Sequence, residues 1–184
     1  MIREQAITLA QSLFLRDQGG YGCAETCLLV LSRAYSLDRA EDVSAAMALN
    51  GGIAWSGGVC GAITGAALAV GRLSAQRIAD QETAKLVARR ITMDLMAAFR
   101  RAFGDVNCRS LVGVDLSTAS GHAAFVASGT AHIVCWRQVE FVVDRLVQLQ
   151  ERGAWDDTVQ QLTESERPTD SPSISAEQGG PHAV

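Results

Sequence analysis

The stretch that decides the fold is Gly51–Gly71, GGIAWSGGVCGAITGAALAVG. It carries no charged side chain over a length that would suffice for a transmembrane helix. Glycine is too frequent in it for such a span. The pair Gly57-Gly58 would weaken a helix near its middle, because each glycine costs about 1 kcal/mol relative to alanine. We therefore predict a glycine-rich loop followed by a short buried helix over residues 59–73.

Apolar side chains recur at helical spacing on both sides of this stretch. Only two short runs, FVAS at 125–128 and IVCW at 133–136, hint at strands. A loop is expected over 115–121, and Asp38 is expected to cap the helix at 40–49. The helices are predicted over residues 2–17, 23–35, 40–49, 59–73, 80–104 and 135–151. The sequence thus predicts an all-α fold, a compact bundle of five or six helices with a glycine-rich loop.

The composition is that of one globular domain. The chain has 184 residues, of which 48% are hydrophobic and 20% charged. The net charge of −4 argues against a general binder of nucleic acid or of anionic membranes. A domain over 1–163 is expected, followed by a disordered tail over 164–184 that holds all three prolines. The first residues lack the unbroken apolar segment of a secretory signal, which favours a cytoplasmic location.

Five cysteines carry the chemistry that the sequence suggests. Cys23, Cys60, Cys108 and Cys135 are each expected at the start of a helix, and the chain has no C-x-x-C pair. Free N–H groups and the helix dipole stabilise a thiolate there, the form that attacks disulfides or binds metals. Four such sulfurs at one end of the bundle would match the usual ligands of an iron–sulfur cluster. The alternative is that they are small buried hydrophobes, and Cys27 is expected in the core.

The order of the motifs around these cysteines resembles one known family. The segments YGCAETCLLVL, GGVCGAITGA and NCRSLVGVDLS precede Cys135, and the second contains the pattern C-G-A-x-x-G. Over about residues 5–150 the chain resembles the redox-active proteins named for the cysteine pattern C_GCAxxG_C_C. The resemblance implies a compact domain whose four cysteines are redox-active or hold an iron–sulfur centre. Carried over residue by residue, they are Cys23, Cys60, Cys108 and Cys135.

Glycines near these cysteines would suit such a centre. The N–H groups of Gly57, Gly58 and Gly61 would form a nest for an anionic cluster. The alternative, that these glycines make a turn and permit close helix packing, is compatible with that use. The chain also departs from the family, in which asparagine is more usual where Gly22 stands here, and Cys27 is additional.

Several larger side chains allow two interpretations each, a role at a cluster or an ordinary structural role. Trp55 and Trp136 would shield a cluster from solvent, or belong to the core as tryptophan usually does. Arg109 would steady a thiolate or lie on the surface. His122 or His132 would replace a cysteine ligand, or be structural like most single histidines.

The sequence leaves three functions open. The first is an iron–sulfur protein for electron transfer, in which Cys23, Cys60, Cys108 and Cys135 bind a [2Fe–2S] or [4Fe–4S] cluster and a redox partner protein exchanges electrons with it. The second is a metal-free thiol–disulfide oxidoreductase that pairs Cys23 with Cys27 or Cys60. The third is a module with structural zinc. No nucleic-acid partner and no membrane span are expected, a homodimer is compatible with the sequence, and no residue decides whether a substrate reacts at the site.

Overall fold

The computed structural model describes residues 1–14 and 20–164, and within these ranges the chain is helical. The described part forms no strand, and its one isolated β-bridge joins Val59 to Asn107. This confirms the predicted all-α fold. The α-helices are α1 (Arg3–Phe14), α2 (Cys23–Ala34), α3 (Gly61–Arg77), α4 (Gln81–Phe103), α5 (Cys108–Val112), α6 (Ala119–Ala127), α7 (Trp136–Leu146) and α8 (Arg152–Glu164). Shorter turns are the 3-10 helices η1 (Ser44–Leu49) and η3 (Val147–Gln150) and the π-helical turn η2 (Ala131–Cys135).

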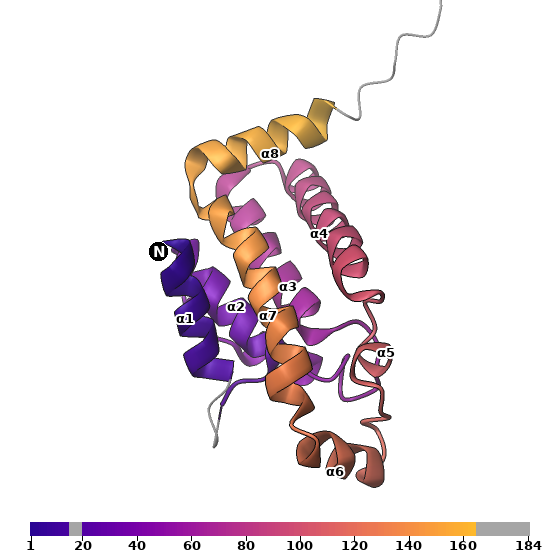
Figure 1. The fold of residues 1–184 in the computed structure, drawn as a ribbon. Helices are drawn as coiled ribbons and strands as arrows, with labels where there is room; N and C mark the ends of the chain where they lie inside the picture. Colours follow the sequence, from indigo (N-terminus) through magenta and orange to yellow (C-terminus); the bar gives the residue numbers. More distant parts are fainter. Residues whose placement is uncertain (15–19, 165–184) are drawn as a thin grey trace, which may run out of the picture.

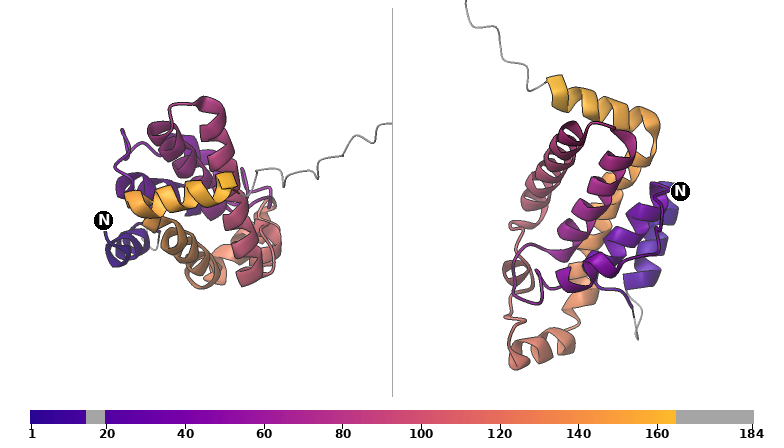
Figure 2. Two further views of the ribbon diagram at one scale, coloured as in Figure 1. Left: turned by 90° about the horizontal axis from the view of Figure 1, so that it is seen from above. Right: turned by 180° about the vertical axis from the view of Figure 1, so that it is seen from behind.

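The bundle is built around α2. Helices α1, α3 and α7 all pack on it, and the side chains of α2 are consequently buried on nearly every face. Helix α4 packs on α3 and α7, while α8 crosses one end of the bundle (Figures 1 and 2). The short helices α5 and α6 lie at the opposite end. The N-terminal ends of α2, α3 and α7 therefore lie at the end of the molecule that carries α5 and α6.

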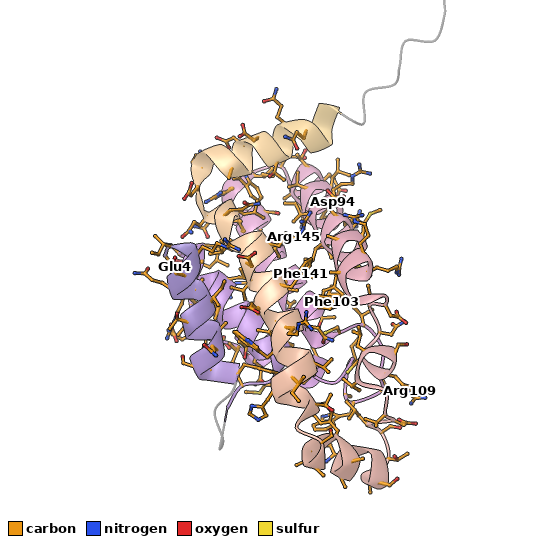
Figure 3. All side chains as sticks on the ribbon, viewed as in Figure 1. Glu4, Asp94, Phe103, Arg109, Phe141 and Arg145 are labelled. Atoms are coloured by element: carbon orange, nitrogen blue, oxygen red, sulfur yellow. The ribbon has the colours of Figure 1, made fainter. Side chains whose placement is uncertain are left out.

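The longest helix follows its sequence signals closely. The carboxylate of Asp80 accepts the N–H of Thr83 at 2.8 Å and caps α4, and Gly104 ends it with a φ of 85°. Its apolar stripe is buried against α3 and α7. Between α4 and α7, Phe103 meets Phe141 edge-on with ring centroids 5.3 Å apart (Figure 3). The buried stripe consists of Ala84, Val87, Ile91, Leu95 and Phe99, together with Ala98.

The helix predicted over 40–49 is wrong in its first half. Residues 40–43 are not helical, and just before them Ser36 and Arg39 adopt left-handed backbone conformations, with φ of 54° and 51°. The chain turns before the 3-10 helix η1 begins at Ser44. Asp42, in place of the expected Asp38, accepts the N–H of Ser44 at 3.1 Å.

The region between α5 and α7 is helical where a loop and two strands were suggested. Helix α6 begins inside the predicted loop, because the hydroxyl of Thr118 accepts the N–H of Gly121 at 3.0 Å and starts it. FVAS lies at the end of α6, and IVCW lies in η2 and the start of α7. Alanine is the most frequent residue in this segment, and its high helix propensity favours helix over strand in the two apolar runs.

The last predicted helix, over 135–151, divides into α7 and η3, and the sequence did not predict α8, which follows it. Trp155 fixes α8 to the bundle, since it is only 3% exposed and its ring lies under the guanidinium of Arg77 at 5.2 Å. Arg77 also donates to the carbonyls of Leu149 and Gln150, at 2.9 and 2.7 Å. Residues 15–17 of the first predicted helix and the tail from 165 onward lie outside the described residues. Among the described helices, none has the length and apolar character needed to cross a bilayer.

Candidate functional site

Three of the candidate cysteines line one cavity at the end of the bundle that carries α6. The cavity has a volume of about 350 Å³, and the sulfur-bearing residues around it are Cys23, Cys108 and Cys135. None of the described residues that line it is charged. The aromatic part of its wall comes from Phe14, Tyr21, Trp55 and Phe125. The cavity thus presents three sulfurs to an uncharged and largely apolar space.

Cys23 is the first residue of α2, and its sulfur is surrounded by backbone donors. Burial raises the pKa of the Cys23 thiol, and hydrogen bonds from the N–H groups of Gly51, Ala24, Cys23 itself and Gly61 act in the opposite direction. These N–H groups come from the start of α2, from the glycine loop and from the start of α3. They form an anion-binding concavity around a single sulfur atom.

The glycines of the C-G-A-x-x-G motif have a direct steric reason. A Cβ atom at Gly61 would lie 2.3 Å from the sulfur of Cys23, closer than any real contact. A Cβ atom at Gly65 would lie 2.1 Å from the carbonyl oxygen of Ala24. Both glycines therefore allow α3 to approach the first turn of α2, and the motif brings the sulfur of Cys23 to the start of α3.

Cys60 lies behind the cavity. Its side chain is 3% exposed, and its sulfur lies 3.4 Å from Oε1 of Gln138 on α7. Burial is the main cause that raises the pKa of Cys60 well above its usual value. The negative charges that Cys23, Cys108 and Cys135 would carry as thiolates raise it further. Negative charges on Cys23, Cys108 and Cys135 would therefore each disfavour a thiolate at Cys60.

Cys108 and Cys135 complete the set. Burial, followed by the charge of Cys23, raises the pKa of Cys108 to about 11. Burial, followed by the charges of Cys23 and Cys108, raises that of Cys135 to about 12. The expectation that helix starts would acidify the four thiols is therefore wrong for the cofactor-free protein, because burial raises the pKa of each and outweighs the backbone donors at Cys23 and Cys60.

The expected helix starts exist for three of the four cysteines. Cys23 and Cys108 are the first residues of α2 and α5, and Cys60 directly precedes α3. Cys135 is different, because it lies inside a continuous helical path in which η2 runs into α7. Its backbone is helical, with φ of −67° and ψ of −33°, so it lacks the free N–H groups of a true helix start.

The glycine loop holds two of the cysteines together. The N–H of Cys108 donates to the carbonyl of Gly58 at 2.7 Å, and that of Arg109 donates to Gly57 at 3.1 Å. The N–H of Cys60 donates to the carbonyl of Val106 at 2.8 Å. These bonds flank the Val59–Asn107 bridge and fasten the segment before α3 to the segment before α5.

The N–H groups of Gly57 and Gly58 are used within the loop. They donate to the carbonyls of Gly51 and Gly52 at 3.1 and 3.0 Å. Gly57 has a φ of +83°, which glycine adopts without strain. Both glycines therefore make the predicted turn, whereas the N–H of Gly61 is directed at a sulfur.

Among the other candidate side chains, Trp55 lines the cavity, whereas Arg109, His122, His132 and Trp136 are not among its described lining residues. Arg109 pairs with Asp115 at 2.7 Å and extends outward from α5 (Figure 3). Trp55 is 41% exposed, and its ring lies 4.2 Å from that of His122. His132 is exposed, and Trp136 is partly buried against the core. Cys27 is fully buried in the hydrophobic core, as predicted.

Two polar residues at the site were not identified from the sequence. Asn50 accepts the N–H of Ala24 at 3.0 Å and contacts the sulfur of Cys23 at 3.7 Å. Gln138 contacts Cys60 and is buried in α7. Both lie far along the chain from the cysteine that they contact, so no local pattern could have indicated them.

In the part of the chain that the structure describes, no three His, Cys, Asp or Glu side chains meet closely enough to hold one metal ion. The five cysteines are free thiols. A family pattern described as "Putative redox-active protein (C_GCAxxG_C_C)" matches residues 21–149. The chain belongs to this family. The match includes all five cysteines and most of the bundle. Comparisons with curated proteins and with solved structures find no match.

Proposed function

We propose that this protein is an iron–sulfur redox protein in which Cys23, Cys60, Cys108 and Cys135 hold a [2Fe–2S] or [4Fe–4S] cluster. When bound, the cluster would supply one-electron transfer, and a redox partner protein would exchange electrons with it. The observation that carries the proposal is that cysteine sulfurs from four separate segments gather at one end of the bundle, where three of them line a cavity whose described lining residues are uncharged. Four cysteine sulfurs are the usual ligands of such a cluster, so the donor set matches it in kind. The side chains would have to draw together around it, because no three of them meet closely enough for one metal ion in the described residues.

The chain's own residues would serve a cluster in two ways. The N–H groups around Cys23 would stabilise a thiolate and donate to sulfur, which is a known means of tuning the potential of a cluster. The aromatic side chains of Phe14, Tyr21, Trp55 and Phe125 would keep water away from it. An uncharged and largely apolar wall of this kind suits electron transfer, because it lowers the local dielectric around a bound cluster.

The metal-free thiol–disulfide reaction receives less support. It needs a thiolate that an external disulfide can reach. The pKa values of Cys108 and Cys135 are raised to about 11 and about 12 by burial, so both remain thiols near neutral pH. Cys27, the partner that such a reaction would offer to Cys23, is fully buried. A positive metal centre would compensate the charge of four thiolates at this site. The proposal also places the protein in the cytoplasm, where cysteines stay reduced.

The test is metal and sulfide analysis of the full chain purified without oxygen. We expect iron together with acid-labile sulfide, and absorbance near about 400 nm from thiolate-to-iron charge transfer. Serine at position 23, 60, 108 or 135 should abolish both. The matched control is Cys27→Ser, whose hydroxyl can donate to the carbonyl one turn earlier in α2, and it should retain iron. Stoichiometric zinc without sulfide would make the site structural, and metal-free thiols would leave thiol–disulfide exchange.

A further inference from the structure

The start of α2 lacks a cap of its own. Gly22 occupies the N-cap position and has no side chain with which to accept the first N–H groups of the helix. The carboxamide of Asn50 takes over this role, because its Oδ1 accepts the N–H of Ala24 at 3.0 Å. Ala24 is the second residue of α2, which is where an N-cap side chain normally accepts a hydrogen bond. The cap of α2 thus comes from the end of η1.

Asn50 also occupies the space that a side chain at position 22 would fill. A Cβ atom built on Gly22 would lie 2.3 Å from Cγ and Oδ1 of Asn50 and 2.5 Å from its Nδ2. Glycine at this position is therefore required by the carboxamide that lies against it. The two positions are complementary, since only one of them can carry the capping side chain.

Further contacts connect this cap to the sulfur of Cys23. Nδ2 of Asn50 donates to Oε2 of Glu25 at 2.9 Å, and the same oxygen accepts the N–H of Gly22 at 2.9 Å. Oδ1 of Asn50 lies 3.7 Å from the sulfur of Cys23. The next residue, Gly51, directs its N–H to that sulfur. One carboxamide therefore fixes both the first turn of α2 and the beginning of the glycine loop around Cys23.

We propose that Asn50 is the positioning residue of Cys23. It supplies in place of residue 22 the cap that holds the first turn of α2 closed, and it keeps the sulfur among the N–H groups of the loop. The proposal rests on the proposed function only in treating Cys23 as a functional thiol, and it applies to the cluster and to thiol chemistry alike. Asn50 acts through Cys23 and touches no reacting atom beyond it.

The experiment measures the alkylation rate of each cysteine by iodoacetamide and mass spectrometry. It uses the full chain, reduced and freed of metal by a chelator, and expresses the rate of Cys23 relative to Cys108. Loss of an N-cap costs about 1 kcal/mol of helix stability, which corresponds to about fivefold more frequent opening of the first turn. We therefore expect Asn50→Ala to raise the Cys23 ratio about fivefold. Gly22→Ala should do the same, because its Cβ displaces the carboxamide of Asn50.

A double variant that exchanges the residues at positions 22 and 50 distinguishes positioning of Cys23 from a general effect on the stability of the fold. Gly22→Asn combined with Asn50→Gly returns the capping side chain to position 22, and the ratio should return to within about twofold of the wild type. The matched control is Asn107→Ala, since Asn107 precedes Cys108 but makes no side-chain cap, and it should leave the Cys23 rate unchanged. An unchanged ratio in Asn50→Ala, equal acceleration of all cysteines, or failure of the exchanged pair would each overturn the proposal. Iron analysis of the wild type tests the proposed function separately, because these ratios are measured without metal.

Discussion

Replacing Gly61 by alanine should damage the site through one steric contact. The added Cβ atom would lie 2.3 Å from the sulfur of Cys23 and 3.2 Å from both the nitrogen of Ala24 and the carbonyl oxygen of Leu49. Ordinary contacts between a carbon atom and a sulfur atom begin at about 3.5 Å. The sulfur therefore has to move by about 1 Å, or α3 has to withdraw from α2. The contacts with Ala24 and Leu49 involve backbone atoms, which cannot rotate away as a side chain can.

Overpacking of this kind costs about 1–3 kcal/mol of unfolding free energy. For a domain of this size, each kcal/mol lowers the melting temperature by about 2–4 °C, so a decrease of about 2–12 °C is expected for Gly61→Ala. The measurement is urea and thermal unfolding of the metal-free chain, together with iron content of the chain purified without oxygen. Iron content should fall even under conditions in which the variant remains folded, because the displaced sulfur is a proposed ligand.

Gly71→Ala is the matched control on the same helix. A Cβ atom at Gly71 meets no heavy atom within 4 Å, so alanine there only reduces the entropy of the unfolded chain. It should stabilise the protein by about 0.4–1 kcal/mol and leave the iron content unchanged. If Gly61→Ala is as stable as the wild type and retains iron, the argument that α3 needs a glycine against Cys23 is refuted.

Three further predictions concern stability. Gly65→Ala should destabilise at least as much as Gly61→Ala in urea unfolding, because its Cβ would lie 2.1 Å from a backbone oxygen that no side-chain rotation can move. Trp155→Ala should cost about 3–5 kcal/mol, since it empties the contact that holds α8 on the bundle, and urea unfolding would measure this; a loss below about 1 kcal/mol would contradict it. The metal-free chain should lose stability as the pH rises above 9, because the pKa of Cys108 is raised from 9.0 to about 11 by folding and unfolded thiols ionise first. The loss from Cys108 alone is about 1 kcal/mol at pH 10, and equal urea midpoints at pH 7 and pH 10 would contradict it.

The helical framework could be predicted because its signals are local. Asp80 and Gly104 mark the ends of α4 by capping chemistry, and the apolar stripe between them is periodic. The predictions fail where contacts between distant segments determine the local structure. Helix α8 has few apolar side chains and is held by Trp155 against Arg77, a partner on α3 that the local sequence does not reveal. The left-handed backbone conformation of residues such as Arg39 could not be predicted from the composition either.

The cysteines could be predicted as a group, whereas their environment could not. Motif order and spacing identified the four positions, and the glycines of the motif have the steric role that close helix packing predicts. Their acidity was predicted from helix ends alone, and the structure reverses it because burial of Cys60 and Cys135 dominates. Asn50 was missed since its contact with Cys23 joins two segments that only folding brings together.

The raised pKa values give the site a definite linkage between protons and metal. Folding buries the thiols in neutral form, so a cofactor that binds thiolates must displace their protons. Binding should therefore strengthen as the pH rises, while the metal-free chain becomes less stable over the same range. The two effects have opposite signs and a common origin in burial. The cofactor consequently contributes most to the stability of the folded chain above pH 9, where the empty thiols of Cys108 and Cys135 begin to favour unfolding.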